Sequence, residues 1–113
     1  MRSMSFFLTT RQILDRSKTV TRRRVNTWTK LKVGDVLKAV EKVQGLKKGE
    51  RQRVLGKIQI TGVRVESLCE MSDADCLKEG FPIYNSGQFI RMFVNHMGGE
   101  WDQQVRRIEF KYV

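Results

Sequence analysis

The sequence predicts an α+β fold, a small mixed β-barrel with two or three short helices. Two stretches alternate apolar and polar residues with the period of a half-buried strand, and two others carry the start and stop signals of helices. The chain has 113 residues, a length that suits one compact core. We therefore expect residues 1–113 to form a single domain.

Strand patterns occur early, in the middle and at the end of the chain. Ser5 to Leu8 is predicted as a short strand, and Val36 to Val40 as a second strand that follows a turn. Val54 to Val65 is predicted as a long strand, whose alternation slips at Gly62 as it does at a β-bulge. The last strand is indicated by three alternating apolar residues, Ile108, Phe110 and Tyr112.

Three helices are predicted from their caps. Thr10 is placed to cap a short helix over Arg11 to Asp15. A second helix is expected from Ser72 to Glu79, because Ser72 and Asp75 have capping-box spacing and a glycine follows Glu79. The third is expected from Ser86 to Met97, where apolar residues recur on one face, and we assign that face to the core.

The charge of the chain favours an anionic partner. It has 22 Lys and Arg against 12 Asp and Glu, which gives a formal net charge of +10. Such an excess attracts polyanions over long distances, and RNA or another single-stranded nucleic acid is the first candidate. Part of the excess lies in a polar excursion from Gln44 to Arg53, which we expect to be a mobile loop.

The segment Lys18 to Arg24 reads Lys-Thr-Val-Thr-Arg-Arg-Arg and is predicted as a basic turn after a helix end. Arginine presents a planar fork of donors to phosphate or carboxylate, and nearby cations or burial can suppress the ammonium form of a lysine. The segment can therefore hold an anion or activate a hydroxyl group. A solvated basic turn is the alternative interpretation.

Other kinds of site find little support in the sequence. Cys69 and Cys76 lack the spacing of a zinc site, and His96 is the single histidine. We predict no metal and no cofactor. No apolar run approaches the length of a signal peptide or a membrane span, so we expect a cytoplasmic protein without a membrane partner.

Several of these segments together resemble the ASCH domain of the PUA-like superfamily. The resemblance rests on the segment from Lys18 to Arg23, on Trp28, on Leu31 to Leu37 and on Ile108 to Phe110. The ASCH signature is G-x-K-x-x-E-x-R. Lys18 and Arg23 match it, whereas Arg16 replaces the glycine and Thr21 replaces the glutamate. A threonine at that place is what the small N4-acetylcytidine amidohydrolases of this family carry.

The similarity to those amidohydrolases implies a catalytic set. It assigns Lys18 as proton acceptor, Thr21 as nucleophile and Glu79 as proton donor. A threonine hydroxyl is a weak nucleophile until a base removes its proton, so a lysine with a suppressed charge is a chemically reasonable partner. The alternative for Glu79 is an exposed residue in the last turn of its helix.

Three functions remain open at this point, and the sequence favours the first, with the second as the main alternative. The first is recognition of RNA or a nucleotide in a basic cleft formed by Lys18, Arg22, Arg23, Arg24 and Trp28. The second is deacetylation of a modified cytidine nucleoside by Lys18, Thr21 and Glu79. A ribonuclease is the third, without a residue signature of its own. Trp28 is assigned either to base stacking or to the core.

Overall fold

The computed structural model describes residues 1–113 and confirms the α+β class. Five strands form one mixed sheet in the order β1-β3-β4-β5-β2. Only the pairing of β1 with β3 is parallel. The strands are β1 (Ser3–Ser5), β2 (Val20–Arg24), β3 (Val36–Val40), β4 (Val54–Ser67) and β5 (Gln104–Tyr112).

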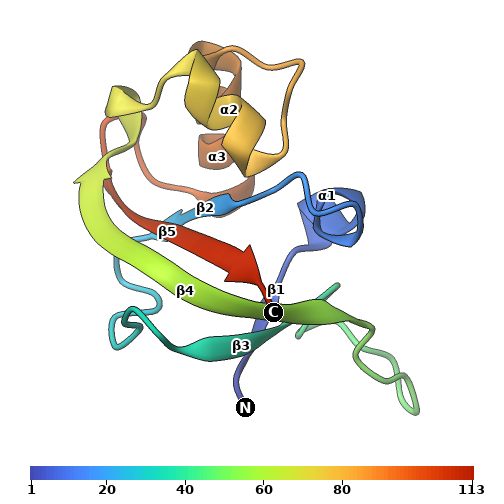
Figure 1. Cartoon of the computed structure of the whole chain (residues 1–113). Helices are drawn as coiled ribbons and strands as arrows, with labels where there is room; N and C mark the ends of the chain where they lie inside the picture. Colours follow the sequence, from blue (N-terminus) through green and yellow to red (C-terminus); the bar gives the residue numbers. More distant parts are fainter.

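The sheet is strongly curved but does not close into a barrel (Figure 1). Its two edge strands, β1 and β2, are not paired with each other. A side chain links them instead, because Nη2 of Arg23 on β2 donates a hydrogen bond of 2.7 Å to the carbonyl of Ser5 on β1. The predicted barrel is thus an open sheet whose edges meet through Arg23.

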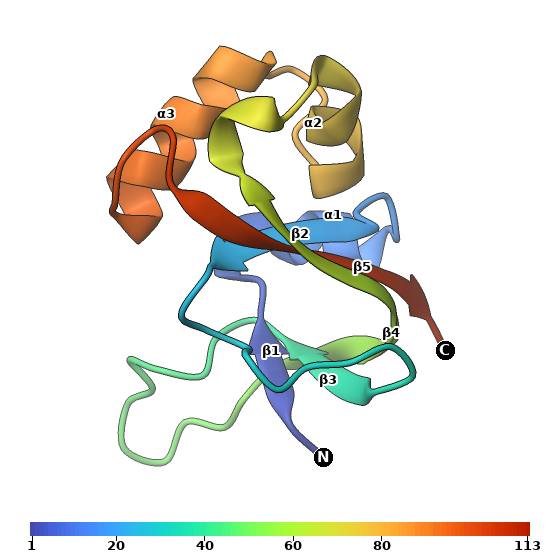
Figure 2. The same cartoon turned by 90° about the vertical axis from the view of Figure 1, so that its left-hand side faces the viewer.

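Three helices accompany the sheet: α1 (Thr10–Leu14), α2 (Asp73–Glu79) and α3 (Ser86–Met97). Figure 2 shows α2 and α3 together over one end of the sheet, where β4 and β5 bend. The two helices begin with the reciprocal hydrogen bonds of capping boxes, formed by Ser72 with Asp75 and by Asn85 with Gln88. None of the helices has the length and apolar character needed to span a bilayer.

Two clusters of buried side chains stabilise the structure. The larger lies inside the curved sheet and includes Met4, Ile58 and Phe110. The smaller lies between α2, α3 and the ends of β4 and β5, and includes Phe89 and Phe93. The apolar face predicted for α3 does contribute to the core, since Phe89 and Phe93 are both buried.

The predicted first strand was misplaced. β1 is Ser3–Ser5, and Phe7–Thr9 forms a 3-10 turn that leads into α1. Thr10 does not cap α1 but is its first residue, and its hydroxyl donates to the carbonyl of Phe6. The apolar run had suggested a strand, but the side chains of Phe7 and Leu8 are exposed.

The long strand and its irregularity are confirmed. β4 pairs with β5 on both sides of a register shift between Ile60 and Gly62. The extra residue, Thr61, bends the strand, as expected of a bulge. This bend lets the second half of β4 run toward α2.

The basic segment is also different from the prediction. Val20–Arg24 is not a turn but strand β2, paired antiparallel with β5. The bend that brings Lys18 near the strand lies before Val20, and backbone hydrogen bonds hold it on both sides. Lys18 N donates to Gln12 O of α1, and Thr19 N donates to Lys78 O of α2.

Candidate functional site

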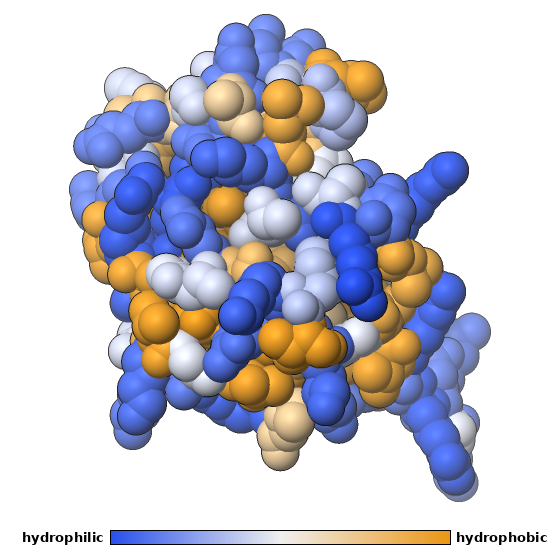
Figure 3. Space-filling model, in the orientation of Figure 1, coloured by the Kyte–Doolittle hydropathy of each residue, from blue (hydrophilic) through white to orange (hydrophobic).

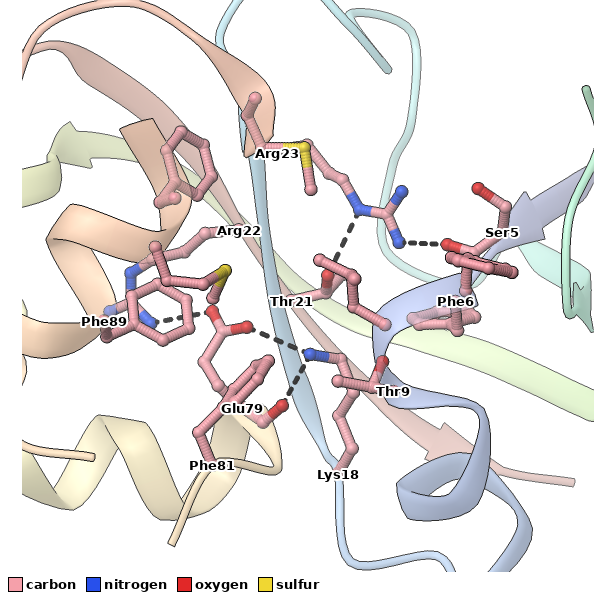
Figure 4. Close-up of a pocket in the computed structure, with 15 residues that line it drawn as sticks. Ser5, Phe6, Thr9, Lys18, Thr21, Arg22, Arg23, Glu79, Phe81 and Phe89 are labelled. Atoms are coloured by element: carbon pink, nitrogen blue, oxygen red, sulfur yellow. Dashed lines mark hydrogen bonds and ion pairs between the residues drawn. The ribbon is translucent and has the colours of Figure 1, made fainter. Parts of the chain in front are cut away.

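A pocket of about 180 Å³ lies where β2 passes between the 3-10 turn and the helices α2 and α3 (Figure 4). Lys18, Thr21 and Glu79, the three predicted catalytic residues, all line it. Their side chains are directed toward the same part of the pocket. The structure thus brings together three residues that are separated by up to 61 positions in the chain.

Lys18 and Glu79 form a buried pair. Their side chains are 3% and 2% exposed, and Nζ of Lys18 lies 3.0 Å from Oε1 of Glu79. The same Nζ donates a 2.6 Å hydrogen bond to the backbone carbonyl of Glu79. Glu79 is therefore not the solvated last-turn residue that its position at the end of a helix suggested.

The surroundings of Lys18 suppress its charge. Burial lowers the pKa of Lys18, and the nearby charges of Arg23 and Arg22 lower it further, whereas the charge of Glu79 opposes the shift. The net direction is downward. Two of the three adjacent arginines thus act on the lysine as the sequence suggested, but desolvation is the larger cause.

Gly80 allows this pair to form. It ends α2 in the left-handed conformation, with φ +91°, and lies against α1. A Cβ at this position would lie 2.9 Å from Cγ of Gln12 and 3.5 Å from Cβ of Lys18. A larger residue would therefore push the end of α2 away from Lys18.

We expect Gly80→Ala to destabilise the fold by about 1–3 kcal/mol, because it combines a strained φ with a steric overlap. Gly49→Ala is the matched control, since Gly49 has φ +82° but no atom within 4 Å of the added Cβ. Urea denaturation of both variants measures the difference. Equal losses would mean that α2 and α1 are not in tight contact at Gly80.

Arg22 also lines the pocket, although its side chain is fully buried behind Glu79. Its Nη1 donates to Glu79 at 3.1 Å, and its Nη2 donates to Asp75 at 2.9 Å. The side chain of Arg22 is 0% exposed. Arg22 therefore orients the carboxylate of Glu79 and does not present its guanidinium to a polyanion on the surface.

Arg107 is the neighbour of Arg22 across the β2–β5 pair. Two arginines side by side repel each other unless carboxylates compensate, and Arg107 contacts Glu109, Asp75 and Glu66. The resulting network of acids and arginines supports the wall of the pocket behind Glu79. No sequence pattern indicates this network, because its members come from four separate segments.

The network makes stability depend on pH. Burial alone would raise the pKa of Asp75, but the hydrogen bond from Ser72 and the charges of Arg22 and Arg107 hold it below 3.8. A lowered pKa in the folded state means that the carboxylate stabilises the fold above about pH 3.8 and that this contribution disappears as the pH falls.

Asp75→Asn should accordingly be less stable than the wild type at neutral pH, and the difference should narrow as the pH falls below about 4. Urea denaturation of both proteins at several pH values tests this expectation. Glu70→Gln serves as control, because Glu70 is exposed and makes no ion pair. A difference in unfolding free energy that stays constant with pH would show that the charge of Asp75 does not contribute to stability.

Arg23 shares the pocket face of β2 with Thr21, as residues two apart on a strand do. Its Nε donates to the Thr21 hydroxyl oxygen at 3.1 Å, and its guanidinium lies 5.1 Å from the centre of the Phe6 ring. Burial lowers the pKa of Arg23 to about 10, which leaves it protonated at neutral pH. A fixed positive charge therefore lies beside the candidate nucleophile.

Arg24 and Trp28 lie outside the pocket. Arg24 is exposed, and its one side-chain hydrogen bond is a long one, 3.4 Å, to the carbonyl of Met97. Trp28 is half-buried at the edge of the larger core and borders a second, more open groove. Of the five residues predicted to form one basic cleft, Lys18, Arg22 and Arg23 line the pocket, whereas Arg24 lies on the surface and Trp28 on the groove.

The apolar wall of the pocket was not predicted as part of a site. It is formed by Phe81 and by residues of α3, namely Phe89, Met92, Phe93 and Met97. Their spacing in the sequence indicates a buried helix face, and no pattern within that helix distinguishes a core face from a pocket wall. The Lys18 amine lies 5.8 Å from the centre of the Phe81 ring, a contact that separates it from solvent.

This arrangement suits acid–base chemistry on a small uncharged group. An amine with a lowered pKa, a carboxyl group in contact with it and a hydroxyl group line one pocket that is largely apolar. Low polarity strengthens each electrostatic interaction inside such a pocket. The volume is below the range of about 300–1,000 Å³ that is typical of sites for larger ligands. The pocket is thus suited to a ring with a short substituent.

No family model matches the sequence, and no curated protein matches it. Solved structures do match the fold. An ASCH domain from Lactobacillus crispatus superposes with a TM-score of 0.70 at 15% identity, over 98% of this chain and 78% of that one. Protein EF3133 from Enterococcus faecalis, described by the family model DUF984, gives 0.69 at 15% identity, over 99% and 79%. The hypothetical protein PH0355 gives 0.69 at 16% identity, over 99% and 96%.

These likenesses extend over nearly the whole chain, although the identities are low. They agree with the resemblance seen in the segment from Lys18 to Arg23 and in the closing strand. The chain therefore has an ASCH-like fold.

Proposed function

We propose that this protein hydrolyses the amide bond of an N4-acylated cytidine, with N4-acetylcytidine as the reference substrate. The observation that carries the proposal is the meeting of Lys18, Thr21 and Glu79 in one small, largely apolar pocket, with Lys18 and Glu79 both buried. Buried ionisable groups that line a pocket are typical of functional sites. The pair here lines the same pocket as the Thr21 hydroxyl group.

The reaction would proceed in two halves. In the first, Lys18 takes the proton of the Thr21 hydroxyl, and the oxygen attacks the acyl carbon. The carbon–nitrogen bond then breaks as Glu79 gives its proton to the departing cytidine nitrogen. In the second half, Glu79 takes a proton from water, the water oxygen attacks the acyl-threonine, and Lys18 returns its proton to Thr21.

Arg23 supports the same chemistry from the side. Its Nε already donates to the oxygen of Thr21, so a positive charge lies where negative charge develops during the attack. The guanidinium is held by a second hydrogen bond to the carbonyl of Ser5 and needs no reorganisation. Arg23 thus stabilises the threonine oxygen as its proton departs.

Lys18 and Glu79 share one proton in this scheme. The reactive form has a neutral amine and a protonated acid, and transfer of one proton across the 3.0 Å contact interconverts it with the ion pair. The rate should fall at low pH when the pair takes up a second proton, and at high pH when it loses its only one. The resulting bell-shaped profile reports apparent pKa values of the pair and not of either residue.

A second candidate is recognition of RNA or a nucleotide without turnover. The net charge of +10 favours it, as does the position of Arg23 and Trp28 on one groove. The burial of Arg22 weighs against it, because this arginine is already paired with three carboxylates. We therefore rank it below the hydrolase.

The direct test is incubation of the purified protein with N4-acetylcytidine, followed by chromatography of the products. We expect cytidine and acetate in equal amounts. In parallel, titration with a short single-stranded RNA without acylated bases measures binding alone. Binding of that RNA without any release of acetate from the nucleoside would overturn the hydrolase and leave the second candidate.

A further inference from the structure

An open groove of about 580 Å³ lies beside the pocket. The two hollows share three lining residues, Ser5, Phe7 and Arg23. Arg23 therefore stands on the wall between them, with Thr21 on one side and the groove on the other. Whatever extends out of the pocket past Arg23 enters this groove.

Arg23 retains one donor group for a ligand. Its Nε is bonded to Thr21 and its Nη2 to Ser5, whereas Nη1 has no acceptor within the protein. Figure 4 shows this third nitrogen directed away from both hydrogen bonds. A guanidinium that is fixed by two bonds and retains a free edge is well suited to a phosphate oxygen.

Trp28 supplies an aromatic surface at the same groove. Its backbone has a left-handed conformation, with φ 55°, which is uncommon for a bulky residue. The guanidinium of Arg2 lies 5.6 Å from the centre of its ring. Strained residues of this kind are often found at binding sites, and an indole ring is a platform on which a base can stack.

A basic arm, residues 41–53, continues from the groove. It leaves the sheet between β3 and β4 and projects as a hydrophilic extension in Figures 1 and 3. Lys42 at its start lines the groove. Lys42 and Arg53 are paired with Glu50 and Glu41, but three further basic residues have no ion-pair partner: Lys47, Lys48 and Arg51.

From these observations we propose that the groove and the basic arm bind the nucleotides that flank the reactive base, so that the substrate is an acylated cytidine within single-stranded RNA. The inference rests on the proposed hydrolase. A pocket of about 180 Å³ encloses a modified base but not the sugar and phosphates that follow it. Those groups lie at the mouth, where Arg23, Trp28 and the arm offer a cation, an aromatic ring and further positive charge.

The test compares two substrates, free N4-acetylcytidine and a short single-stranded RNA that contains one N4-acetylcytidine. We expect kcat/KM to be roughly tenfold or more higher for the RNA at low salt, because phosphate and stacking contacts are added. The advantage should shrink as the salt concentration rises. Equal efficiency on both substrates, or hydrolysis of the nucleoside alone, would overturn the inference and leave the hydrolase intact.

Two double variants test whether the basic arm causes the higher kcat/KM on RNA. Lys47→Ala/Lys48→Ala should lower kcat/KM for the RNA and reduce the log–log salt slope by up to about two units, with no change for the nucleoside. Lys57→Ala/Lys111→Ala makes the same change of charge at two exposed lysines that line neither hollow. Equal losses in both pairs would show that net charge alone attracts the RNA.

If neither substrate is hydrolysed, the proposed function fails, and the groove is tested by binding. The unmodified RNA should then bind more weakly to Lys47→Ala/Lys48→Ala than to the matched control pair. Identical affinities of the two variants would overturn the groove as well.

Discussion

Alanine at Lys18, Thr21 or Glu79 should each reduce hydrolysis of N4-acetylcytidine by roughly 10²–10⁴-fold, the contribution expected of a positioned acid, base or nucleophile. The three losses should not add, because the residues act as one unit and the first change already stops the reaction. The double and triple variants should therefore be about as slow as the slowest single variant. Initial rates of cytidine release measure all of these effects.

Two controls separate chemistry from folding. Binding of the nucleoside to Thr21→Ala should survive, since the hydroxyl reacts but does not hold the base. Thr19→Ala changes an exposed threonine two residues earlier and should leave the rate unchanged. Additive losses in the three alanine variants, or full activity in any one of them, would contradict the shared mechanism.

Replacement of Arg22 by methionine should cost about 3–5 kcal/mol of unfolding free energy, because it leaves buried carboxylates without their partner. Glu79 would keep Lys18, but Asp75 would retain only its contacts at the helix start and Arg107. Chemical denaturation at neutral pH measures the loss. The free energy of unfolding should be partly recovered in Arg22→Met/Asp75→Asn, because the second change removes one of the carboxylates that lost its partner.

Arg24→Met is the matched control for this experiment. It removes an arginine side chain two residues further along β2, where the guanidinium is exposed and makes one long hydrogen bond. We expect a change of less than about 0.5 kcal/mol. Similar losses at Arg22 and Arg24 would show that the buried network is not what stabilises the end of α2.

Local signals predicted much of the fold. The capping box at Ser72 and Asp75, the stop at Gly80 and the slip of β4 near Gly62 are each encoded within a few residues, and all are present. The approach of Lys18 to Glu79 follows from no local pattern. The resemblance to the amidohydrolases was what associated these residues, and the structure places them in contact.

What escaped prediction depends on contacts between distant segments. The run of three arginines was expected to bind one anion together, but successive side chains of a strand point in opposite directions, so Arg22 and Arg23 have different partners within the pocket. The carboxylates that pair with Arg22 come from β4 and α2. No sequence pattern around Arg22 indicates these partners. Phe6, Phe7 and Leu8 were predicted to belong largely to the first strand, but β1 ends at Ser5, and these residues line the pocket instead.

The central claim is that the pocket holds the acyl amide against Thr21, and a crystal structure of Thr21→Val with N4-acetylcytidine tests it most directly. The variant removes the nucleophile and nearly preserves the shape of the side chain. We predict that the acyl carbon lies about 3–3.5 Å from the position of the missing hydroxyl, with the cytidine nitrogen facing Glu79. A nucleoside bound only in the groove at Trp28, with the pocket closed to its acyl group, would contradict the account.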